Sequence, residues 1–80
     1  MFYTYILKSQ KDGKYYYGST GNMDKRLAEH NSGKVSATRN RIPLVLHYLE
    51  PYNERIIAIK RELFFKKRSG YKWLKDNDII

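Results

Sequence analysis

The chain has 80 residues, of which 16 are Lys or Arg and 8 are Asp or Glu, so its formal net charge is +8 at pH 7. A chain of this length is expected to form one domain with a modest core, and its hydrophobic content of 41% excludes a disordered protein. It contains no cysteine, which excludes disulfides, thiolate zinc sites and cysteine nucleophiles.

Residues 2–8 are rich in aromatic and β-branched side chains, which predicts a first strand. Asp12-Gly13 favours a hairpin turn, and residues 14–20 predict a second strand that pairs antiparallel with the first. Successive side chains of a strand point to opposite faces. The first strand therefore carries Tyr3, Tyr5 and Leu7 on one face and Phe2, Thr4 and Ile6 on the other, and the second carries Tyr16 and Gly18 on one face.

A first helix is expected after this hairpin. Asn22 is a suitable N-cap for a helix that runs to about Asn31, and Ser32-Gly33 ends it. Its apolar stripe is formed by Met23, Leu27 and His30. Arg26 and His30 are four residues apart and are therefore neighbours on the helix surface.

Residues 33–43 form a polar, basic loop without apolar periodicity, and residues 44–49 predict a third strand that Glu50-Pro51 ends. Asn53 is a candidate N-cap for a second helix that reaches about Arg68. Its helical periodicity is carried by Ile56, Ala58, Ile59, Leu63 and Phe65. Ser69-Gly70 should break this helix before a short last helix over residues 71–76, which places Trp73 and Leu74 on the core.

The order hairpin, helix, strand, helix, helix predicts a single α+β domain over residues 1–80, with a small three-stranded antiparallel sheet flanked by helices. No apolar run approaches the roughly 20 residues that span a bilayer, and the N-terminus starts directly with strand-like sequence, so we expect a cytoplasmic protein without membrane contact. The excess of positive charge favours a nucleic acid partner. An anionic membrane surface is the weaker alternative, because no long amphipathic helix stands alone.

Glu62 is the carboxylate that stands out, because it lies between Ile59 and Leu63 on the side of its helix that should face the core. A carboxylate beside an apolar stripe costs free energy unless it is paired or binds a cation. An ion pair with Lys66, four residues on, or with Arg61 would also satisfy it. The sequence leaves both interpretations open.

A second group of candidates consists of Tyr5, Tyr16, Gly18, Arg26 and His30. Each has an ordinary structural explanation. The tyrosines could be core aromatics, and the glycine could allow a bend at the end of a strand. Arg26 could be one charge on a solvated helix face, and His30 a last-turn histidine that the helix dipole favours. Taken one at a time, these residues therefore do not identify a site.

Taken together, they resemble the GIY-YIG nuclease family. The resemblance is carried by Tyr3-Thr4-Tyr5 on the first strand, Tyr16-Tyr17-Gly18 on the second, Arg26 and His30 on the following helix, and Glu62 on a later helix. Residues 16–30 are the most specific part. They are similar to the same segment of phage intron homing endonucleases and of the N-terminal domain of the repair excinuclease, and closer still to the small standalone bacterial members.

The pattern departs from the family in four places. The first triplet retains only its tyrosine, Tyr5, and the second has Tyr17 where the family has an aliphatic residue. Family members that act in repair carry a lysine after the glycine of the second triplet, where this chain has Ser19, so that role is vacant or moved to Lys25. Many members have an asparagine near the end of the domain, for which Asn77 is the one late candidate.

The resemblance implies metal-dependent hydrolysis of a phosphodiester backbone in DNA, with a link to repair or recombination. Nothing in the sequence requires more than a monomer. It implies that Glu62 holds one Mg²⁺ or Mn²⁺, that Tyr16 activates water as the general base and that Arg26 pairs with phosphate. Tyr5 would orient the water or phosphate, His30 would bind phosphate or Tyr16, and Gly18 would let the backbone approach the substrate. The residues expected to bind the substrate are Gly18, Ser19, Lys25, Lys34, Thr38, Arg39 and Arg41.

Two other functions remain open. A non-catalytic nucleic-acid-binding module would need the basic residues, including Arg26, but not Glu62. A protein-interaction domain of a larger repair complex would expose an apolar patch, expected around Phe64 and Phe65, and would bind its partner with little dependence on salt.

Overall fold

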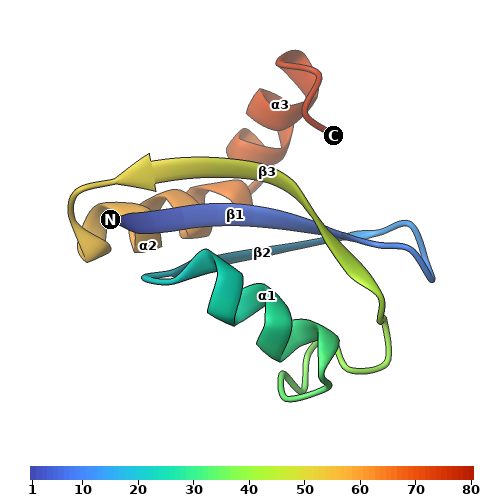
Figure 1. Cartoon of the computed structure of the whole chain (residues 1–80). Coiled ribbons are helices and arrows are strands. Elements are labelled where there is room, and N and C mark those ends of the chain that lie inside the picture. Colours follow the sequence, from blue (N-terminus) through green and yellow to red (C-terminus); the bar gives the residue numbers. More distant parts are fainter.

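Three antiparallel strands form the middle layer of the fold (Figure 1). The computed structural model describes all 80 residues. The elements are β1 (Phe2–Ser9), β2 (Tyr15–Thr20), α1 (Met23–Asn31), β3 (Leu44–Tyr52), α2 (Arg55–Phe65) and α3 (Arg68–Asp76). The strand order is β2-β1-β3, so β1 is central and β2 and β3 are both edge strands. The predicted α+β architecture is confirmed.

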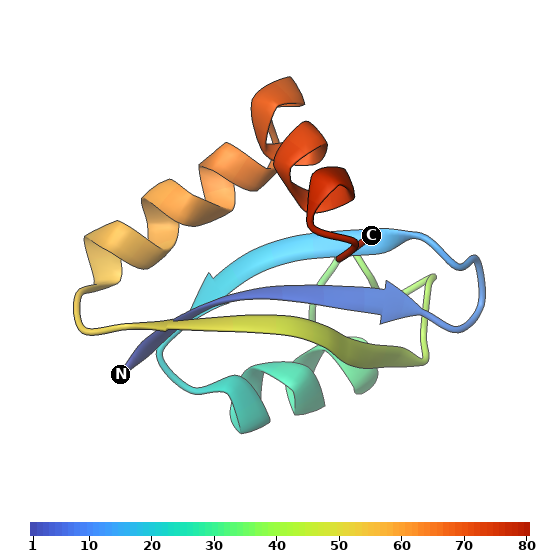
Figure 2. The ribbon, with the colours of Figure 1, turned by 90° about the horizontal axis from the view of Figure 1, so that it is seen from above.

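The helices cover opposite faces of this sheet, with α1 on one side and α2 and α3 on the other (Figure 2). The alternation of β1 explains why both faces have a core. Tyr5, Leu7 and Leu44 form the buried cluster under α1, with Tyr16, Met23 and Leu27 packed around it. Ile6, Phe65 and Leu74 form the buried cluster under α2 and α3. The predicted assignment of side chains to the two faces of β1 is confirmed.

The start of α1 follows the sequence prediction. The Asn22 side chain accepts a hydrogen bond from the Lys25 backbone N–H at 3.1 Å, as an N-cap does. At the other end, the Asn31 amide pairs with both backbone groups of Leu44, at 2.9 and 2.7 Å. The two hydrogen bonds between Asn31 and Leu44 tie the end of α1 to the start of β3.

The predicted end of the third strand was wrong. β3 continues beyond Leu49 to Tyr52, with Tyr3 facing Pro51 across the pair formed with β1. Proline cannot donate to a ladder, but it is tolerated on an edge strand whose free side has no partner. Because β3 is such an edge strand, Pro51 does not end it.

The predicted boundaries of the last two helices were also wrong. α2 starts after Glu54 rather than Asn53 and ends at Phe65, and α3 starts at Arg68. Gly70 therefore lies within the first turn of α3 instead of breaking a helix. A Cβ at Gly70 would stand 1.8 Å from the Phe64 carbonyl oxygen. The glycine is needed for the close packing of α3 against the end of α2.

The apolar stripe predicted for α2 is only partly buried. Ile56 and Leu63 are 54% and 51% exposed, whereas Ala58 and Phe65 are each 1% exposed. The helix lies against the sheet through Ala58, whose carbonyl oxygen accepts a hydrogen bond from the Thr4 hydroxyl at 2.8 Å. That contact turns Ile56 and Leu63 outward. None of the three helices has the length and the apolar character needed to cross a membrane.

Candidate active site

A chain of hydrogen bonds lies buried under α1. The Tyr5 hydroxyl and His30 Nε2 are 2.9 Å apart, and His30 Nδ1 and Thr38 Oγ1 are 2.7 Å apart. Burial, together with the nearby charge of Arg26, lowers the pKa of His30 to about 4. The imidazole is therefore neutral at neutral pH, with one nitrogen donating and the other accepting. Thr38, a predicted substrate ligand, is buried and holds His30 from inside the core.

Gly18 makes room for Tyr5. A Cβ at Gly18 would stand 2.4 Å from both Cζ and the hydroxyl oxygen of Tyr5, which is closer than atoms can approach. Gly18 is buried, and the Tyr5 ring fills the volume that a side chain would need. The glycine therefore has a packing role here, and its expected role of admitting the substrate close to the backbone stays a prediction. Burial raises the pKa of Tyr5, and the Arg26 guanidinium opposes that rise. Tyr5 is therefore a protonated, internal phenol.

Tyr16 is the accessible tyrosine of this group. Its ring packs on His30, with 5.0 Å between ring centroids, and lies 6.4 Å from the Tyr5 ring. No buried side-chain polar atom of the structure lacks a hydrogen-bond partner. The half-buried Tyr16 has no such partner for its hydroxyl within the chain, so that hydroxyl faces solvent. It can reach a molecule bound at the surface, which Tyr5 cannot.

Glu62 approaches from the opposite layer. The Ser19 hydroxyl donates to Glu62 Oε1 at 2.8 Å, and Lys66 Nζ pairs with Oε2 at 2.7 Å. The i+4 ion pair that the sequence allowed is therefore formed. The carboxylate nevertheless lies near the tyrosine cluster, since its charge contributes to the raised pKa of Tyr5 after burial, the larger cause. Ser19 acts on Glu62 rather than pointing freely toward a substrate.

These residues meet along the β2 edge of the sheet. Tyr16 lies on the α1 face of β2, and Ser19 lies on the α2 face, where it bonds to Glu62. Arg26 and His30 come from α1. An edge strand is the one place where side chains from both layers can meet without a strand between them. Tyr16, Arg26 and His30 surround Tyr5, and Glu62 is close enough for its charge to act on the Tyr5 hydroxyl. Of the four expected residues only Arg26 lines the cavity described next, so their convergence on one cleft stays a prediction.

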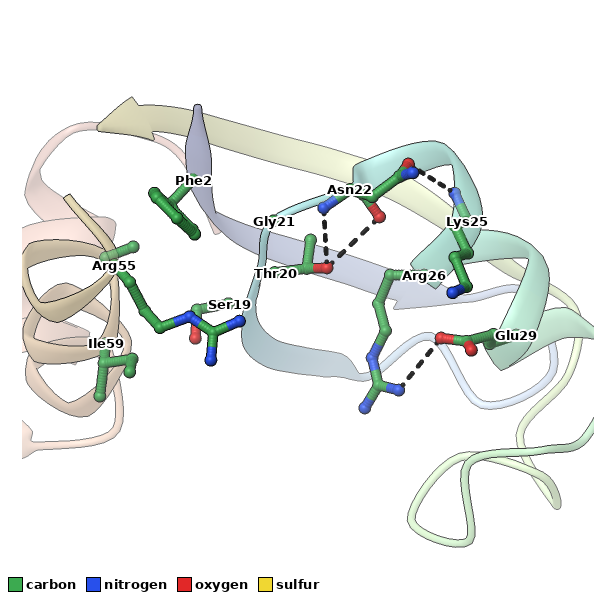
Figure 3. Close-up of a pocket in the computed structure, with 11 residues that line it drawn as sticks. Phe2, Ser19, Thr20, Gly21, Asn22, Lys25, Arg26, Glu29, Arg55 and Ile59 are labelled. Carbon is green, nitrogen blue, oxygen red and sulfur yellow. Dashed lines mark hydrogen bonds and ion pairs between the residues drawn. The ribbon is translucent and has the colours of Figure 1, made fainter. Parts of the chain in front are cut away.

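A cavity of about 400 Å³ opens beside this cluster (Figure 3). It lies between the end of β2, the first turns of α1 and the start of α2. Its lining residues include Ser19, Asn22, Lys25, Arg26, Glu29 and Arg55. Arg26 donates to Glu29 at 3.3 Å, and the Arg55 guanidinium lies 5.7 Å from the centre of the Phe2 ring.

Arg55 and Phe2 line the cavity although no motif in the sequence marked them as site residues. Arg55 occupies the first turn of α2, where the helix dipole disfavours a cation. That placement was the one local signal that could have drawn attention to it. Phe2 had no such signal, because an aromatic residue at the start of a strand is ordinary.

The loop before β3 divides into supporting and free residues. Arg41 pairs with Asp12 at 2.9 Å, which lowers the pKa of Asp12 to about 2, and it donates to the Tyr15 carbonyl oxygen at 3.3 Å. Arg41 thus ties the loop to the hairpin and is not available for substrate in this structure. Lys34 and Arg39 are exposed and have no ion pair.

Two further expectations fall outside the site. Asn77 is the C-cap of α3 and donates to the Trp73 carbonyl oxygen at 2.8 Å. Phe65 is 1% exposed and Phe64 is half-buried, so the apolar patch expected there is not present. Apart from Met1 and Tyr71, the large exposed apolar side chains lie instead on β3 and on the outer side of α2: Val45, Leu46, Leu49, Ile56, Ile57 and Leu63.

The donors available for a metal ion are few. No group of three or more His, Cys, Asp or Glu side chains is close enough to hold one. Mg²⁺ often takes only one or two protein carboxylates and completes its shell with water and substrate phosphate. Glu62 has acceptor positions left beside Ser19 and Lys66, because a carboxylate offers about four. The residues present therefore fit a hard cation that is shared with the substrate.

Comparison with known proteins identifies the family. The family model described as the GIY-YIG catalytic domain matches residues 1–75. A UPF0213 protein of Bacillus licheniformis is 46% identical over 68 residues, which cover 84% of this chain and 69% of the relative. One from Bacillus cereus is 42% identical over 57 residues, which cover 70% of this chain and 59% of the relative, so the match spans less than two thirds of that protein.

A similar fold has been solved by solution NMR for a UPF0213 protein of Bacillus halodurans. The TM-score is 0.55 at 32% sequence identity, over 95% of this chain and 84% of that chain. The family match covers both tyrosine triplets, Arg26, His30 and Glu62. The chain belongs to the GIY-YIG catalytic domain family, whose members are nuclease-type domains.

Proposed function

We propose that this protein is an endonuclease that hydrolyses phosphodiester bonds in DNA with a bound Mg²⁺ or Mn²⁺. We further propose that it selects structured substrates in repair or recombination. Family membership supports the nuclease class. The observation that carries the proposal is the placement of Tyr16, Arg26 and Glu62 around the buried Tyr5, beside a cavity that Arg26 lines. A base, a phosphate ligand and a carboxylate are what such a reaction needs.

Arg26 is suited to hold the phosphate that reacts. Its guanidinium lines the cavity, and its ion pair with Glu29 keeps it at the wall (Figure 3). A planar guanidinium can donate two parallel hydrogen bonds to phosphate oxygens. Because the Glu29 pair is partly exposed, phosphate can compete for Arg26 at small cost.

Tyr16 would take the proton from the attacking water as a phenolate, after its own proton has been lost to solvent, and the bound cation or Arg26 would favour that form. Its hydroxyl is suited to this because it is accessible and unpaired within the chain. Tyr5 has a different task, since it is 1% exposed and cannot touch a substrate. It is a positioning residue, which packs between Arg26, Tyr16 and His30. Neutral His30 in turn fixes Tyr5 through Nε2 and is itself fixed by Thr38.

Glu62 would hold the cation, and Ser19 orients its carboxylate. When bound, the cation supplies charge that polarises the phosphate and stabilises the leaving oxygen. Lys66 occupies Oε2 in the free protein and must release it or share it. The ion pair is weak enough for this, because the Lys66 side chain is 47% exposed.

The remaining basic residues provide attraction that does not depend on base sequence. Lys25, Lys34 and Arg39 are exposed and have no carboxylate partner. Contacts of such residues with the sugar-phosphate backbone position the protein without reading bases. Binding of DNA should therefore weaken steeply as salt rises.

One observation favours a second candidate, a nucleic-acid-binding module without catalysis. The Lys66–Glu62 contact at 2.7 Å already neutralises the carboxylate on which hydrolysis depends. A protein that only binds nucleic acid would keep this pair closed in the presence of a divalent cation.

Cleavage of a labelled panel of single-stranded, duplex, flap and branched DNA with Mg²⁺ or Mn²⁺ tests the proposal, with wild type compared with Glu62→Ala. We expect cation-dependent cutting by the wild type that the folded variant lacks. Cutting that survives in the variant would show that Glu62 is misassigned. Salt-sensitive binding by both proteins with no cutting by either would favour the binding module.

A further inference from the structure

We propose that the cavity between α1 and α2 binds the nucleotide that adjoins the cleaved bond, with Arg55 and Lys25 holding its phosphate. This inference rests on the proposed nuclease function, because it assigns the substrate a second point of attachment. The cavity shares Ser19 and Arg26 with the catalytic group, so the two sites are continuous. Neighbouring phosphates of one strand can occupy both.

The charge balance of the cavity points to an anion. Three cationic side chains line it, Lys25, Arg26 and Arg55, against one carboxylate, Glu29. Arg26 pairs with that carboxylate at 3.3 Å, which leaves Lys25 and Arg55 without an acidic partner. In Figure 3 the Arg55 guanidinium points across the cavity toward Ser19 and Arg26 rather than out along the helix. A phosphate between these cations would relieve their repulsion.

Arg55 is held in that position. Its guanidinium carbon lies 5.7 Å from the centre of the Phe2 ring, within the range of a cation–π interaction. The residue also stands in the first turn of α2, where a cation is disfavoured by the helix dipole. An arginine placed against the dipole and aimed into a cavity by an aromatic ring is arranged for a ligand rather than for the stability of the helix.

The size and lining of the cavity favour a nucleotide over a bare phosphate. A volume of about 400 Å³ lies within the usual range of small-molecule sites. Beside the cations it is lined by Ser19, whose hydroxyl donates to Glu62 and can still accept a hydrogen bond from a sugar hydroxyl. Its apolar wall is formed by Phe2, Ala58 and Ile59.

The test is an NMR titration of the ¹⁵N-labelled full chain, without metal, with a 5′-phosphorylated dinucleotide. We expect the amide signals of Gly21, Lys25 and Arg55 to shift. Arg55→Ala should weaken binding about tenfold, the effect of losing a charged hydrogen bond, and Arg55→Lys should fall between. Lys11→Ala is the matched control: it removes one charge at the hairpin turn, at the opposite end of the sheet (Figure 1), and should bind as the wild type does.

A longer oligonucleotide adds a second readout. The slope of log affinity against log salt concentration should become shallower by about one in Arg55→Ala, the change that the loss of one phosphate contact produces. The slope should stay unchanged in Lys11→Ala. Inorganic phosphate and a mononucleotide are titrated in parallel. If inorganic phosphate binds as tightly as the dinucleotide, the cavity is an anion site only and the nucleotide assignment is overturned.

The outcomes separate this inference from the proposed function. Shifts confined to other residues, or equal affinities for Arg55→Ala and Lys11→Ala, would overturn the cavity assignment even if Glu62→Ala abolishes cutting. Loss of dinucleotide binding in Arg55→Ala, together with no cutting by the wild type on any substrate, would establish the cavity as a nucleotide site and reject the nuclease.

Discussion

Two carboxylates on the same side of the sheet, Glu50 and Glu62, have nearly equal burial and different surroundings. Glu50 accepts hydrogen bonds from the hydroxyls of Tyr48 and Tyr52, at 2.6 and 2.8 Å, and two from Arg61, at 2.8 and 3.2 Å. Its side chain is 14% exposed, and that of Glu62 is 18% exposed. With four donors, Glu50 has its acceptor capacity filled.

Glu62 accepts only two hydrogen bonds, one from Ser19 and one from Lys66. It keeps acceptor positions for a further cation, whereas Glu50 has none to offer. The lesson is that burial and an ion pair alone do not mark a functional carboxylate. Unused acceptor capacity, beside groups that can do chemistry, is the feature that distinguishes Glu62.

The pKa values of the residues around Glu50 reflect its four hydrogen-bond donors. Burial alone would raise the pKa of Glu50, but the donors from Arg61, Tyr48 and Tyr52 lower it below the ordinary value. Burial and the Glu50 contact raise the pKa of Tyr48 to about 12. The Arg61 guanidinium also lies 4.3 Å from the centre of a ring of Trp73, on α3. The Glu50 cluster therefore joins β3, α2 and α3 and has a structural role.

Replacing each carboxylate by its amide should separate the two roles most strongly. Glu62→Gln should lower the cleavage rate by at least about 100-fold and change the free energy of unfolding by less than about 1 kcal/mol. Glu50→Gln should lower that free energy by about 2 kcal/mol, because Arg61 loses its counter-charge, and should cut normally when folded. Cleavage rates and urea unfolding of both variants check this, and a folded Glu50→Gln that does not cut would refute the division.

Glu50 and His30, on opposite faces of the sheet, should contribute to the free energy of unfolding over different pH ranges. The folded pKa of His30 is about 4 against an ordinary 6.5, so the unfolded chain binds more protons between those values. The contribution of His30 is therefore complete above pH 6.5 and is lost as the pH falls to 4, by up to about 3 kcal/mol. The folded pKa of Glu50 lies below 4.5, so its contribution is lost only at lower pH.

Urea unfolding across this pH range measures the effect. His30→Gln should flatten the curve between pH 6.5 and 4 and leave the loss at lower pH intact. An unchanged slope in that variant would mean that another group titrates there.

Two glycines provide the next contrast. Gly18→Ala should lower the free energy of unfolding by about 1–3 kcal/mol, the usual cost of overpacking, because the new Cβ meets the Tyr5 ring at 2.4 Å. Tyr5 cannot swing away without losing its bond to His30. Gly21→Ala is the control, since its Cβ would stand at an ordinary 3.5 Å from Phe2. Thermal or urea unfolding distinguishes them, and equal stabilities would show that Tyr5 has another position available.

The smallest expected effect concerns Lys66, whose ammonium group already pairs with Glu62. Lys66→Met should tighten Mn²⁺ binding by up to about fivefold, because it removes a competing exposed ion pair. Lys72→Met is a matched control: Lys72 pairs with Asp76 on α3 with the same i+4 spacing and the same 2.7 Å distance. Calorimetry with Mn²⁺ and metal-free protein measures both. Equal affinities in the two variants would mean that the Lys66 pair does not limit access to Glu62.

Several features of the fold and the site were predictable because they depend on neighbours in the chain. The alternation of β1 is enough to assign Tyr5 and Ile6 to opposite cores. Asn22 caps its helix as predicted, because the capping hydrogen bond spans three residues. The candidate site was predictable for the same reason, because most of the residues that resemble the GIY-YIG pattern lie close together in the sequence, within residues 16–30.

Other features required the tertiary structure, because they join residues far apart in sequence. The sequence could not show that Ser19 would hold Glu62 or that Gly18 would be filled by Tyr5. Pro51 stays within β3 only because that strand lies at the sheet edge, a matter of strand order.

By itself, the sequence determined the alternating faces of the strands, the start of α1 and the set of reactive residue types, since local geometry and side-chain chemistry are sufficient for these. Only the tertiary structure decided which carboxylate keeps free acceptors and which arginines face one cavity. Arg26 and Arg55 line the same cavity because two layers meet beyond the edge of β2. That meeting depends on packing between elements, to which no local pattern of residues corresponds.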